Sequence, residues 1–350
     1  MLLVTRGHAT FCPPSLCAIN IVIMRNQMKW NFILVVSISL CTATLFAHAQ
    51  PYPSKSIRLI VPNAPGGGTD TVARAIADKV GPALGQQIIV DNRGGAGGAI
   101  AAEMVARSPK DGYTLLLGSA ATLITGPALI ANRKYDPVKD FAPVTLTGTT
   151  AYMLVMHPSL PAVSVRELIT LARASDARIT FSSSGQGSPS HLGMELFQAL
   201  AKVKMIHVPF KGGAPAMLSL LQGETFVMVA NFLTALPQAR EKRVRALGVT
   251  SLKRSSLASD IPTIDESGLR GFEVEQFYSI VAPAGTPADI INRLNREITQ
   301  RFAVADVRQR LAHEGIELRT SSPAELGKLN AEQFEKWLRV IQQAGIQHAG

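Results

Sequence analysis

The chain has 350 residues, and its 35 lysines and arginines outnumber its 25 aspartates and glutamates, which gives a net charge of +10. A basic balance invites a nucleic-acid interpretation, but the cations are scattered, and no aromatic residues alternate with the densest cluster, Arg240 to Arg245. That cluster is interpreted as a solvated helix face. The composition therefore argues against nucleic-acid binding and fits a protein that attracts anionic ligands.

The first fifty residues contain no Asp or Glu. From Met24 they follow the pattern of a secretory leader, with a basic start, an apolar stretch from Phe32 to Phe46 and the small-x-small sequence Ala47-His48-Ala49. The pattern predicts a signal peptide over residues 1–49 with cleavage after Ala49; a retained anchor is the alternative, and a start at Met24 is a hypothesis. All three cysteines lie in this segment, so the mature chain would have no disulfide and no thiol site.

The stretch Ile57–Val80 predicts a strand, a glycine loop and a helix in succession. Its apolar start suits a buried strand that Pro62 ends, and Gly66-Gly67-Gly68 let the backbone turn sharply and let a ligand approach it. Thr69 or Asp70 is the expected helix cap. The first N–H groups of the helix lack intrahelical partners and, with the helix dipole, favour an anion. Two interpretations stay open, an anion site and a bare tight turn.

Strands and helices alternate after this unit, with strands over Gln87–Val90 and Tyr113–Leu117 and a helix over Ala99–Arg107. Such alternation is typical of a parallel sheet covered by helices. A second glycine loop spans residues 94–98. Neither loop matches a nucleotide-binding motif, because no Gly-Lys-Ser/Thr follows the first, and Ile100 stands after the second where the dinucleotide fingerprint needs Gly or Ala. Three loops follow strands and are expected at one edge of the sheet, where ligands bind; they begin at Pro65, Gly94 and Gly118.

Two long β-prone stretches, Phe141–Met156 and Phe272–Val281, predict strands that cross between two lobes. Between them the plan of strand, small-residue loop and helix returns. Ser188 is the expected N-cap of one helix, and Ser322 with Glu325 forms the capping box of another. The remaining predicted strands cover residues 178–182, 205–209, 226–230 and 244–250, and the remaining helices cover residues 164–174, 189–201, 216–222, 286–302 and 323–343.

A series of short blocks runs through the chain in a fixed order. They are YPSKSIRLIVP (52–62), PGGGTD (65–70), ALGQQIIVDNRGGAGG (83–98), DGYTLLLG (111–118), YDPVKDFAPV (135–144), SGQGSPSHL (184–192), HVPFKGGAPA (207–216), LGVTSLKR (247–254), IPTIDESGL (261–269) and APAGTP (282–287). Together, over residues 51–346, the chain resembles the solute-binding proteins of tripartite tricarboxylate transporters, also called Bug receptors.

The resemblance implies a periplasmic receptor with the type II-like periplasmic-binding-protein fold. This is an α/β fold of two lobes, each with a central, mostly parallel sheet flanked by helices, joined by crossing strands. The expected lobes are residues 50–148 plus 275–350 and residues 149–274. Such receptors bind small organic acids and deliver them to a membrane transporter of one large and one small subunit. The resemblance thus implies a monomeric binding protein rather than an enzyme, without cofactor, metal or nucleic acid.

In the family, a ligand carboxylate lies between the lobes and is held by backbone N–H groups and ordered waters. Neutral amides and helix ends then meet the ligand's charge, so no catalytic pair is required. Carried over to the matching positions, the candidate ligand residues are Gly67, Gly68 and Thr69 at the carboxylate, Ser119 and Ala121 on the first-lobe wall, Gly185, Gly187, Ser188 and His191 from the second lobe, Lys211 beside them and Asn231 at the far end.

Some of these residues have a purely structural interpretation as well. His191 either contacts the ligand or packs at the start of its helix, and Lys211 either binds a distal carboxylate or is solvated. Ser188 is first of all a helix cap. His207 lies in an apolar strand and is expected to be a core histidine.

The chain departs from the family pattern at two places. Asn63-Ala64 stand where members often have Phe-Pro, and Ala230-Asn231 stand where many have Asp-Asn. An acid at position 230 would accept an ammonium group, so its absence argues for a plain carboxylic acid over an amino acid. Tight binding of aspartate or glutamate in calorimetry would refute this.

Two other functions remain as alternatives. In the first, a protein of this fold acts as a ligand sensor for a membrane kinase, and the residues do not distinguish this role from that of a transport receptor. An exported enzyme is less well supported, because the chain has no Gly-x-Ser-x-Gly or His-Glu-x-x-His motif and its histidines are far apart in the sequence.

Overall fold

The structure is a computed structural model that describes residues 52–130, 132–174 and 178–346. The predicted signal peptide, its cleavage after Ala49 and the start at Met24 lie outside these residues. Among the residues that are described, no helix combines the length and the apolar composition needed to cross a bilayer.

A sheet of 10 strands lies at the centre of the described chain. The strands are β1 (Ile57–Val61), β2 (Ile88–Asn92), β3 (Thr114–Ser119), β4 (Phe141–Met156), β5 (Thr180–Ser183), β6 (Ile206–Pro209), β7 (Val227–Asn231), β8 (Arg245–Val249), β9 (Glu275–Pro283) and β10 (Glu317–Leu318). Their order is β2-β1-β3-β9-β4-β7-β5-β6, with β8 and β10 also paired to β4. β1 is parallel to β2 and β3, and β5 is parallel to β6 and β7, whereas β4 and β9 are antiparallel to their neighbours.

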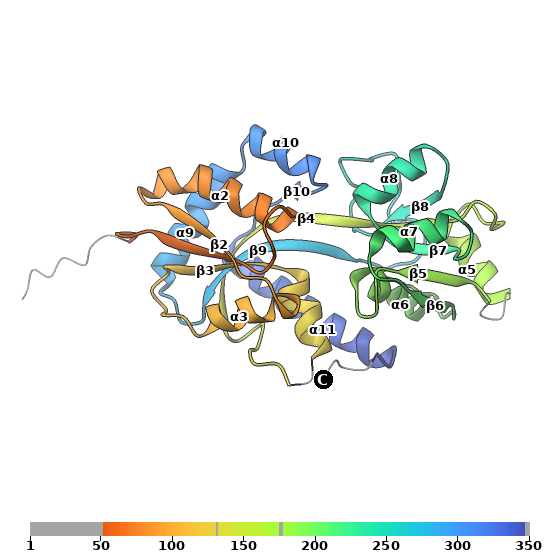
Figure 1. The fold of residues 1–350 in the computed structure, drawn as a ribbon, viewed down its shortest axis with the longest axis horizontal. Helices are drawn as coiled ribbons and strands as arrows, with labels where there is room; N and C mark the ends of the chain where they lie inside the picture. Colours follow the sequence, from red (N-terminus) through yellow and green to blue (C-terminus); the bar gives the residue numbers. More distant parts are fainter. Residues whose placement is uncertain (1–51, 131, 175–177, 347–350) are drawn as a thin grey trace, which may run out of the picture. The chain divides into compact units, whose positions relative to one another are not determined.

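Strand β4 belongs to two groups of strands, because it is 16 residues long. Its first part, Phe141–Ala151, pairs with β9, and its last part, Tyr152–Met156, pairs with β7 and β8. β9 in turn lies between β3 and β4. Figure 1 shows both strands running through the middle of the described chain. The prediction of an α/β fold with two parallel groups of strands joined by crossing strands is confirmed.

Helices cover both faces of this sheet (Figure 1). Alternate residues of β1 show the division, since Ile57 and Leu59 pack with the apolar side chains of one set of helices and Ile60 packs with those of the other. The helices are α2 (Gly68–Leu84), α3 (Ala99–Ala106), α4 (Gly126–Leu129), α5 (Val165–Ala174), α6 (Pro189–Ala201), α7 (Gly213–Leu221), α8 (Phe232–Arg240), α9 (Ala288–Phe302), α10 (Ala305–His313) and α11 (Pro323–Gln343), with short turns η2 (Ala96–Gly98) and η3 (Ala121–Thr125).

Two of the predicted helix caps are confirmed. Ser188 caps α6, and Ser322 and Glu325 form both hydrogen bonds of a capping box at α11. Boundaries differ elsewhere by a few residues: α7 begins at Gly213 rather than at Ala216, because the glycine pair itself starts the helix. Helices α4, α8 and α10, the turns η2 and η3 and the strand β10 had no counterpart in the prediction.

Candidate functional site

The glycine loop after β1 lies beside the loops that follow β2 and β3. A Cβ added to Gly94 would stand 3.7 Å from the backbone nitrogen of Ala64, and one added to Gly98 would stand 2.6 Å from Thr122 Oγ1. Because β1, β2 and β3 are parallel, their carboxyl ends meet at one edge. The predicted gathering of these loops is therefore confirmed.

Helix α2 begins earlier than predicted, at Gly68, with Gly67 as its N-cap. The expectation that Thr69 or Asp70 caps this helix is wrong, since both lie inside its first turn and are buried. No side chain caps Gly67, so the first N–H groups of α2 are left for another acceptor. Gly67 is exposed and its φ of −93° is ordinary, and a Cβ there would meet nothing within 4 Å. The start of α2 is thus open to an approaching anion.

The carboxylate of Asp70 is occupied by neighbouring donors. It accepts hydrogen bonds from the Gly66 N–H at 3.0 Å, from Arg74 Nε at 2.8 Å and from Asn92 Nδ2 at 3.1 Å. Burial alone would raise the pKa of Asp70, but these hydrogen bonds bring the pKa below its ordinary value. The loop is therefore braced by an ionised side chain whose charge Arg74 balances.

Two tyrosines on the crossing strands adjoin the predicted site, and the sequence analysis did not identify them. Tyr278 of β9 lies under Gly68, where a Cβ would stand 3.2 Å from the phenol oxygen, and it is the register partner of Ser119. Tyr152 of β4 is the register partner of Asn231. Burial raises the pKa of both phenols, so both are neutral hydroxyls at physiological pH.

Of the predicted residues, Gly68 and Ser119 thus lie beside Tyr278, and Asn231 lies beside Tyr152. Ser119 ends β3, with its Oγ 3.3 Å from Thr122 Oγ1. Asn231 is exposed and caps α8, its Oδ1 accepting a hydrogen bond from the Leu233 N–H at 3.0 Å. Such neutral donors and acceptors can hold a carboxylate without transferring a proton.

The second predicted loop is closed by its own hydrogen bonds. Gly185 and Gly187 have φ values of 133° and 72°, which residues other than glycine rarely adopt. Ser188 Oγ donates to the Gly185 carbonyl at 2.6 Å and accepts from the His191 N–H at 3.3 Å. The ring of His191 is 5% exposed, and its Nδ1 accepts a hydrogen bond from the Gly187 N–H at 3.0 Å. His191 therefore packs at the helix start, one of its two predicted roles.

Lys211 lies on a loop that is tied to this one. The Phe210 N–H donates to the Ser183 carbonyl at 3.0 Å, and the Gly212 N–H donates to the Ser184 carbonyl at 3.2 Å. Lys211 itself is exposed. These bonds bring an accessible cation to the loop that carries Gly185.

The two halves also touch at Gly187. A Cβ on this residue would stand 2.9 Å from Leu129 Cδ1. Leu129 ends the helical segment that begins at Ala121, another predicted ligand residue. The first-half and second-half loops are therefore linked through this segment.

Two histidines that are far apart in the sequence lie side by side in the structure. His191 and His207 stack with ring centroids 3.8 Å apart, because β6 lies beside β5 and α6 follows β5. Among the residues described, no group of three or more His, Cys, Asp or Glu side chains is arranged to hold a metal ion.

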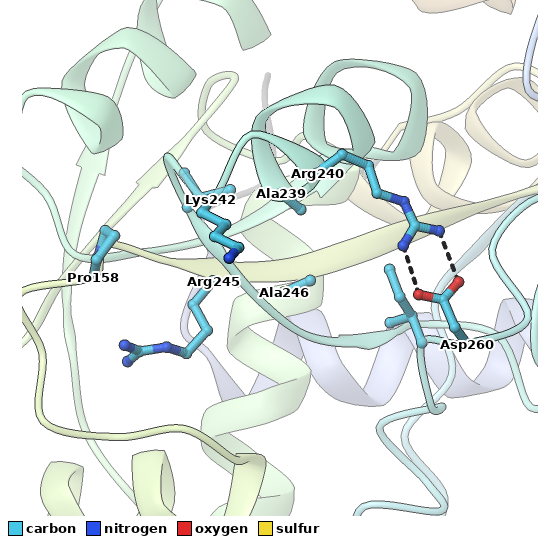
Figure 2. Close-up of a pocket in the computed structure, with 9 residues that line it drawn as sticks. Pro158, Ala239, Arg240, Lys242, Arg245, Ala246 and Asp260 are labelled. Carbon is cyan, nitrogen blue, oxygen red and sulfur yellow. Dashed lines mark hydrogen bonds and ion pairs between the residues drawn. The ribbon is translucent and has the colours of Figure 1, made fainter.

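A separate hollow of about 390 Å³ lies where α8 ends and β8 begins (Figure 2). Its arginines already have partners: Arg240 donates to the two carboxylate oxygens of Asp260 at 2.6 and 2.7 Å, and Arg245 donates to two backbone carbonyls. Because Asn231 is the N-cap of α8, the hollow lies at the other end of this helix from that predicted ligand residue. It is not the candidate site.

Comparison with known proteins identifies relatives over almost the whole chain. The family described as "Tripartite tricarboxylate transporter family receptor" matches residues 72–346. Protein BugT of Bordetella pertussis is 34% identical over 318 residues, which cover 90% of this chain and 98% of BugT.

Two solved structures from Rhodopseudomonas palustris resemble the chain at 33% identity. Rpa4515, solved with adipate, has a TM-score of 0.67, and the match covers 85% of this chain and 99% of the Rpa4515 chain. MatC, solved with bound malate, has a TM-score of 0.64, and the match covers 83% of this chain and 100% of the MatC chain. Both ligands are aliphatic dicarboxylic acids.

Proposed function

The chain belongs to the tripartite tricarboxylate transporter receptor family, and from this premise we propose that it is a periplasmic receptor for a short aliphatic dicarboxylic acid. One carboxylate is bound at the open start of α2, at Gly67, Gly68 and Thr69. The observation that carries the proposal is this uncapped helix start above the neutral hydroxyl of Tyr278. A fixed set of N–H and O–H donors recognises an anion without any catalytic group.

The second carboxylate is met by groups of the other half. Lys211 supplies a positive charge and the side-chain amide of Asn231 supplies an N–H donor. Gly185, Gly187 and Ser188 shape the loop beside Lys211, since their own N–H and hydroxyl donors are already hydrogen-bonded. Ser119 and Ala121 line the wall between the two ends. The dicarboxylate ligands of Rpa4515 and MatC support this choice of substrate class.

The two lobes are residues 50–148 plus 275–350 and residues 149–274, with the hinge in β4 and β9. The lobes close around the acid, as in other hinged receptors. The loaded receptor, a monomer, then delivers the acid to a membrane transporter of one large and one small subunit. The family assignment supports transport over a role as a kinase sensor or an enzyme.

A thermal-shift screen of the protein from Gln50 to Gly350 tests the proposal. Adipate and malate are compared with citrate, benzoate, aspartate and glutamate. A ligand at a hundred times its Kd stabilises by about 2.7 kcal/mol, or roughly 5 °C in a chain of this size. We expect such a shift with adipate or malate and none with aspartate. No shift with any acid, after bound host ligand has been removed by unfolding and refolding, would refute the receptor function.

Transport is tested separately by uptake of radiolabelled adipate or malate into cells that carry the receptor with both membrane subunits. Uptake that depends on the receptor is expected. Uptake that is equal with and without it would favour the sensor.

A further inference from the structure

Three aromatic rings stack behind the loop of residues 183–188. The rings of His191 and His207 are 3.8 Å apart with an angle of 8° between their planes, and Phe181 and His207 are 4.9 Å apart at 14°. His207 is the middle ring, since Phe181 and His191 are 6.3 Å apart. Phe181 and His207 are register partners on the parallel strands β5 and β6. The stack is therefore fixed by strand pairing and by the first turn of α6.

His191 holds one end of the loop through the backbone of Gly187. The Gly187 N–H donates to Nδ1 at 3.0 Å, so this nitrogen carries no proton, and a neutral ring has its proton on Nε2. Nε2 lies 3.4 Å from Glu195 Oε1, on the next turn of the same helix. A proton added at Nδ1 would remove the acceptor that fixes Gly187.

His207 holds the other end through the hydroxyl of Ser183. Its Nε2 lies 2.6 Å from Ser183 Oγ, and that hydroxyl also donates to the Gly185 carbonyl at 3.1 Å and accepts from the Gly185 N–H at 3.2 Å. Whichever of Nε2 and Oγ carries the shared proton, the 2.6 Å hydrogen bond fixes the Ser183 hydroxyl against Gly185. The two imidazoles thus fix the loop at Gly187 and at Gly185.

We propose that His191 and His207 are positioning residues, which hold the loop 183–188 in the conformation that receives the ligand, His191 through an Nδ1 that carries no proton and His207 through the hydroxyl of Ser183. The proposal rests on the proposed function, because the family resemblance assigns this loop to the ligand. The two histidines do not touch the acid themselves. They act through the amide of Gly187 and the hydroxyl of Ser183.

The surroundings of the pair keep His207 neutral. The ionisable groups that face the stack are the two histidines and Glu195. Burial, together with the neighbouring His191, lowers the pKa of His207 to about 4, and Glu195 opposes this effect. Two positive rings 3.8 Å apart would repel each other, so the stack favours neutral imidazoles.

Two substitutions at His191 separate the hydrogen bond from the ring. His191→Asn keeps an acceptor where Nδ1 stands but removes the ring, and His191→Phe keeps the ring but removes the acceptor. The same two changes at His313, an exposed residue at the end of α10, are the controls. Affinity for adipate and malate is measured by calorimetry at pH 7.5. Hydrogen exchange of residues 183–190 is measured in the ligand-free proteins.

We expect His191→Phe to weaken binding about tenfold at pH 7.5 and to speed exchange of the loop, because a buried N–H loses its acceptor. His191→Asn should bind within about threefold of wild type.

Wild-type affinity and wild-type exchange in His191→Phe would overturn the proposal. If His191→Phe fails to fold, the affinity of His191→Asn decides, and a loss of tenfold or more in that variant, which keeps the acceptor, would overturn it. If the wild-type protein binds neither acid, the proposed ligand is wrong. Loop exchange in the ligand-free variants then still tests the positioning role by itself.

Discussion

The phenol oxygen of Tyr278 lies 3.2 Å from the place that a Cβ would take on Gly68. Ile316 Cδ1 lies 3.1 Å from the same place. Gly68 is therefore pressed against the crossing strand β9, whereas its neighbour Gly67 faces open space. Adjacent glycines in one loop thus have different reasons to lack a side chain.

Gly67→Leu should abolish binding of adipate and malate without unfolding the protein. The Cβ of the new side chain meets no atom within 4 Å and needs no unusual φ, and the leucine should fill the space in front of the N–H groups of α2. We expect a ligand-free Tm within about 2 °C of wild type and at least a hundredfold loss of affinity in calorimetry. Wild-type affinity in this variant would move the carboxylate away from α2.

Gly68→Ala is the matched comparison at the neighbouring glycine, where the added methyl group should lower the stability of the fold. Its methyl group presses on Tyr278 and Ile316, which must yield by a few tenths of an ångström. We expect a loss of about 1–2 kcal/mol in the free energy of unfolding, measured in urea. A variant as stable as wild type would show that Tyr278 moves freely.

The sequence predicted features that depend on a few neighbouring residues. The caps at Ser188 and Ser322 are of this kind, and so are the crossing strands, which stand out by their length. Tyr152 and Tyr278 escaped prediction because their role depends on which strands pair with β4 and β9.

The start of α2 was misjudged for a related reason. Aspartate is a common capping residue, but the carboxylate of Asp70 is held by Arg74 of the same helix and by Asn92 of strand β2. The His191–His207 stack likewise depends on the pairing of β5 with β6. Local patterns do not contain such pairings.

Asp70→Asn should destabilise the protein at neutral pH by about 1–3 kcal/mol, because the hydrogen bonds of Asp70 lose a charged acceptor. The pKa of Asp70 is lower in the folded state than the unfolded value near 4, so its contribution is present above pH 4 and is lost as the pH falls further. The gap between variant and wild type, measured in urea, should therefore shrink below pH 4. Asp78→Asn, an exposed position in the same helix, should leave stability unchanged.

The contact of Glu317 with Ser255 should show measurable coupling. Glu317 Oε1 accepts hydrogen bonds from the Ser255 hydroxyl at 2.5 Å and from the Ser256 N–H at 3.0 Å, and this ties β10 to the segment after β8. Glu317→Ala should cost about 1–3 kcal/mol. A double-mutant cycle with Ser255→Ala should give a coupling of about 1 kcal/mol. Additive effects would rule the contact out as a stabilising one; the exposed Glu335 provides the control substitution to alanine.

Glu275 should make the protein less stable as the pH rises. Burial, followed by the nearby charge of Glu273, raises the pKa of Glu275 to about 7, against roughly 4.3 in the unfolded chain. Its contribution is complete below about pH 4.3 and is lost as the pH rises through 7. Glu275→Gln should remove about 1–3 kcal/mol of the decline between pH 5 and pH 8, measured by urea unfolding. An unchanged decline would assign it to other groups.

The position of β9 has a consequence for how the chain can be made. β9 lies between β3 and β4, yet it is produced after every residue of β5 to β8. A chain that emerges from its N-terminus therefore holds β1, β2 and β3 with a bare edge at β3 until residue 283 has appeared. The first half cannot be finished before the second half has been synthesised. A chain interrupted before β9 therefore lacks the strand that completes the first half, although every strand of the second half has already been made.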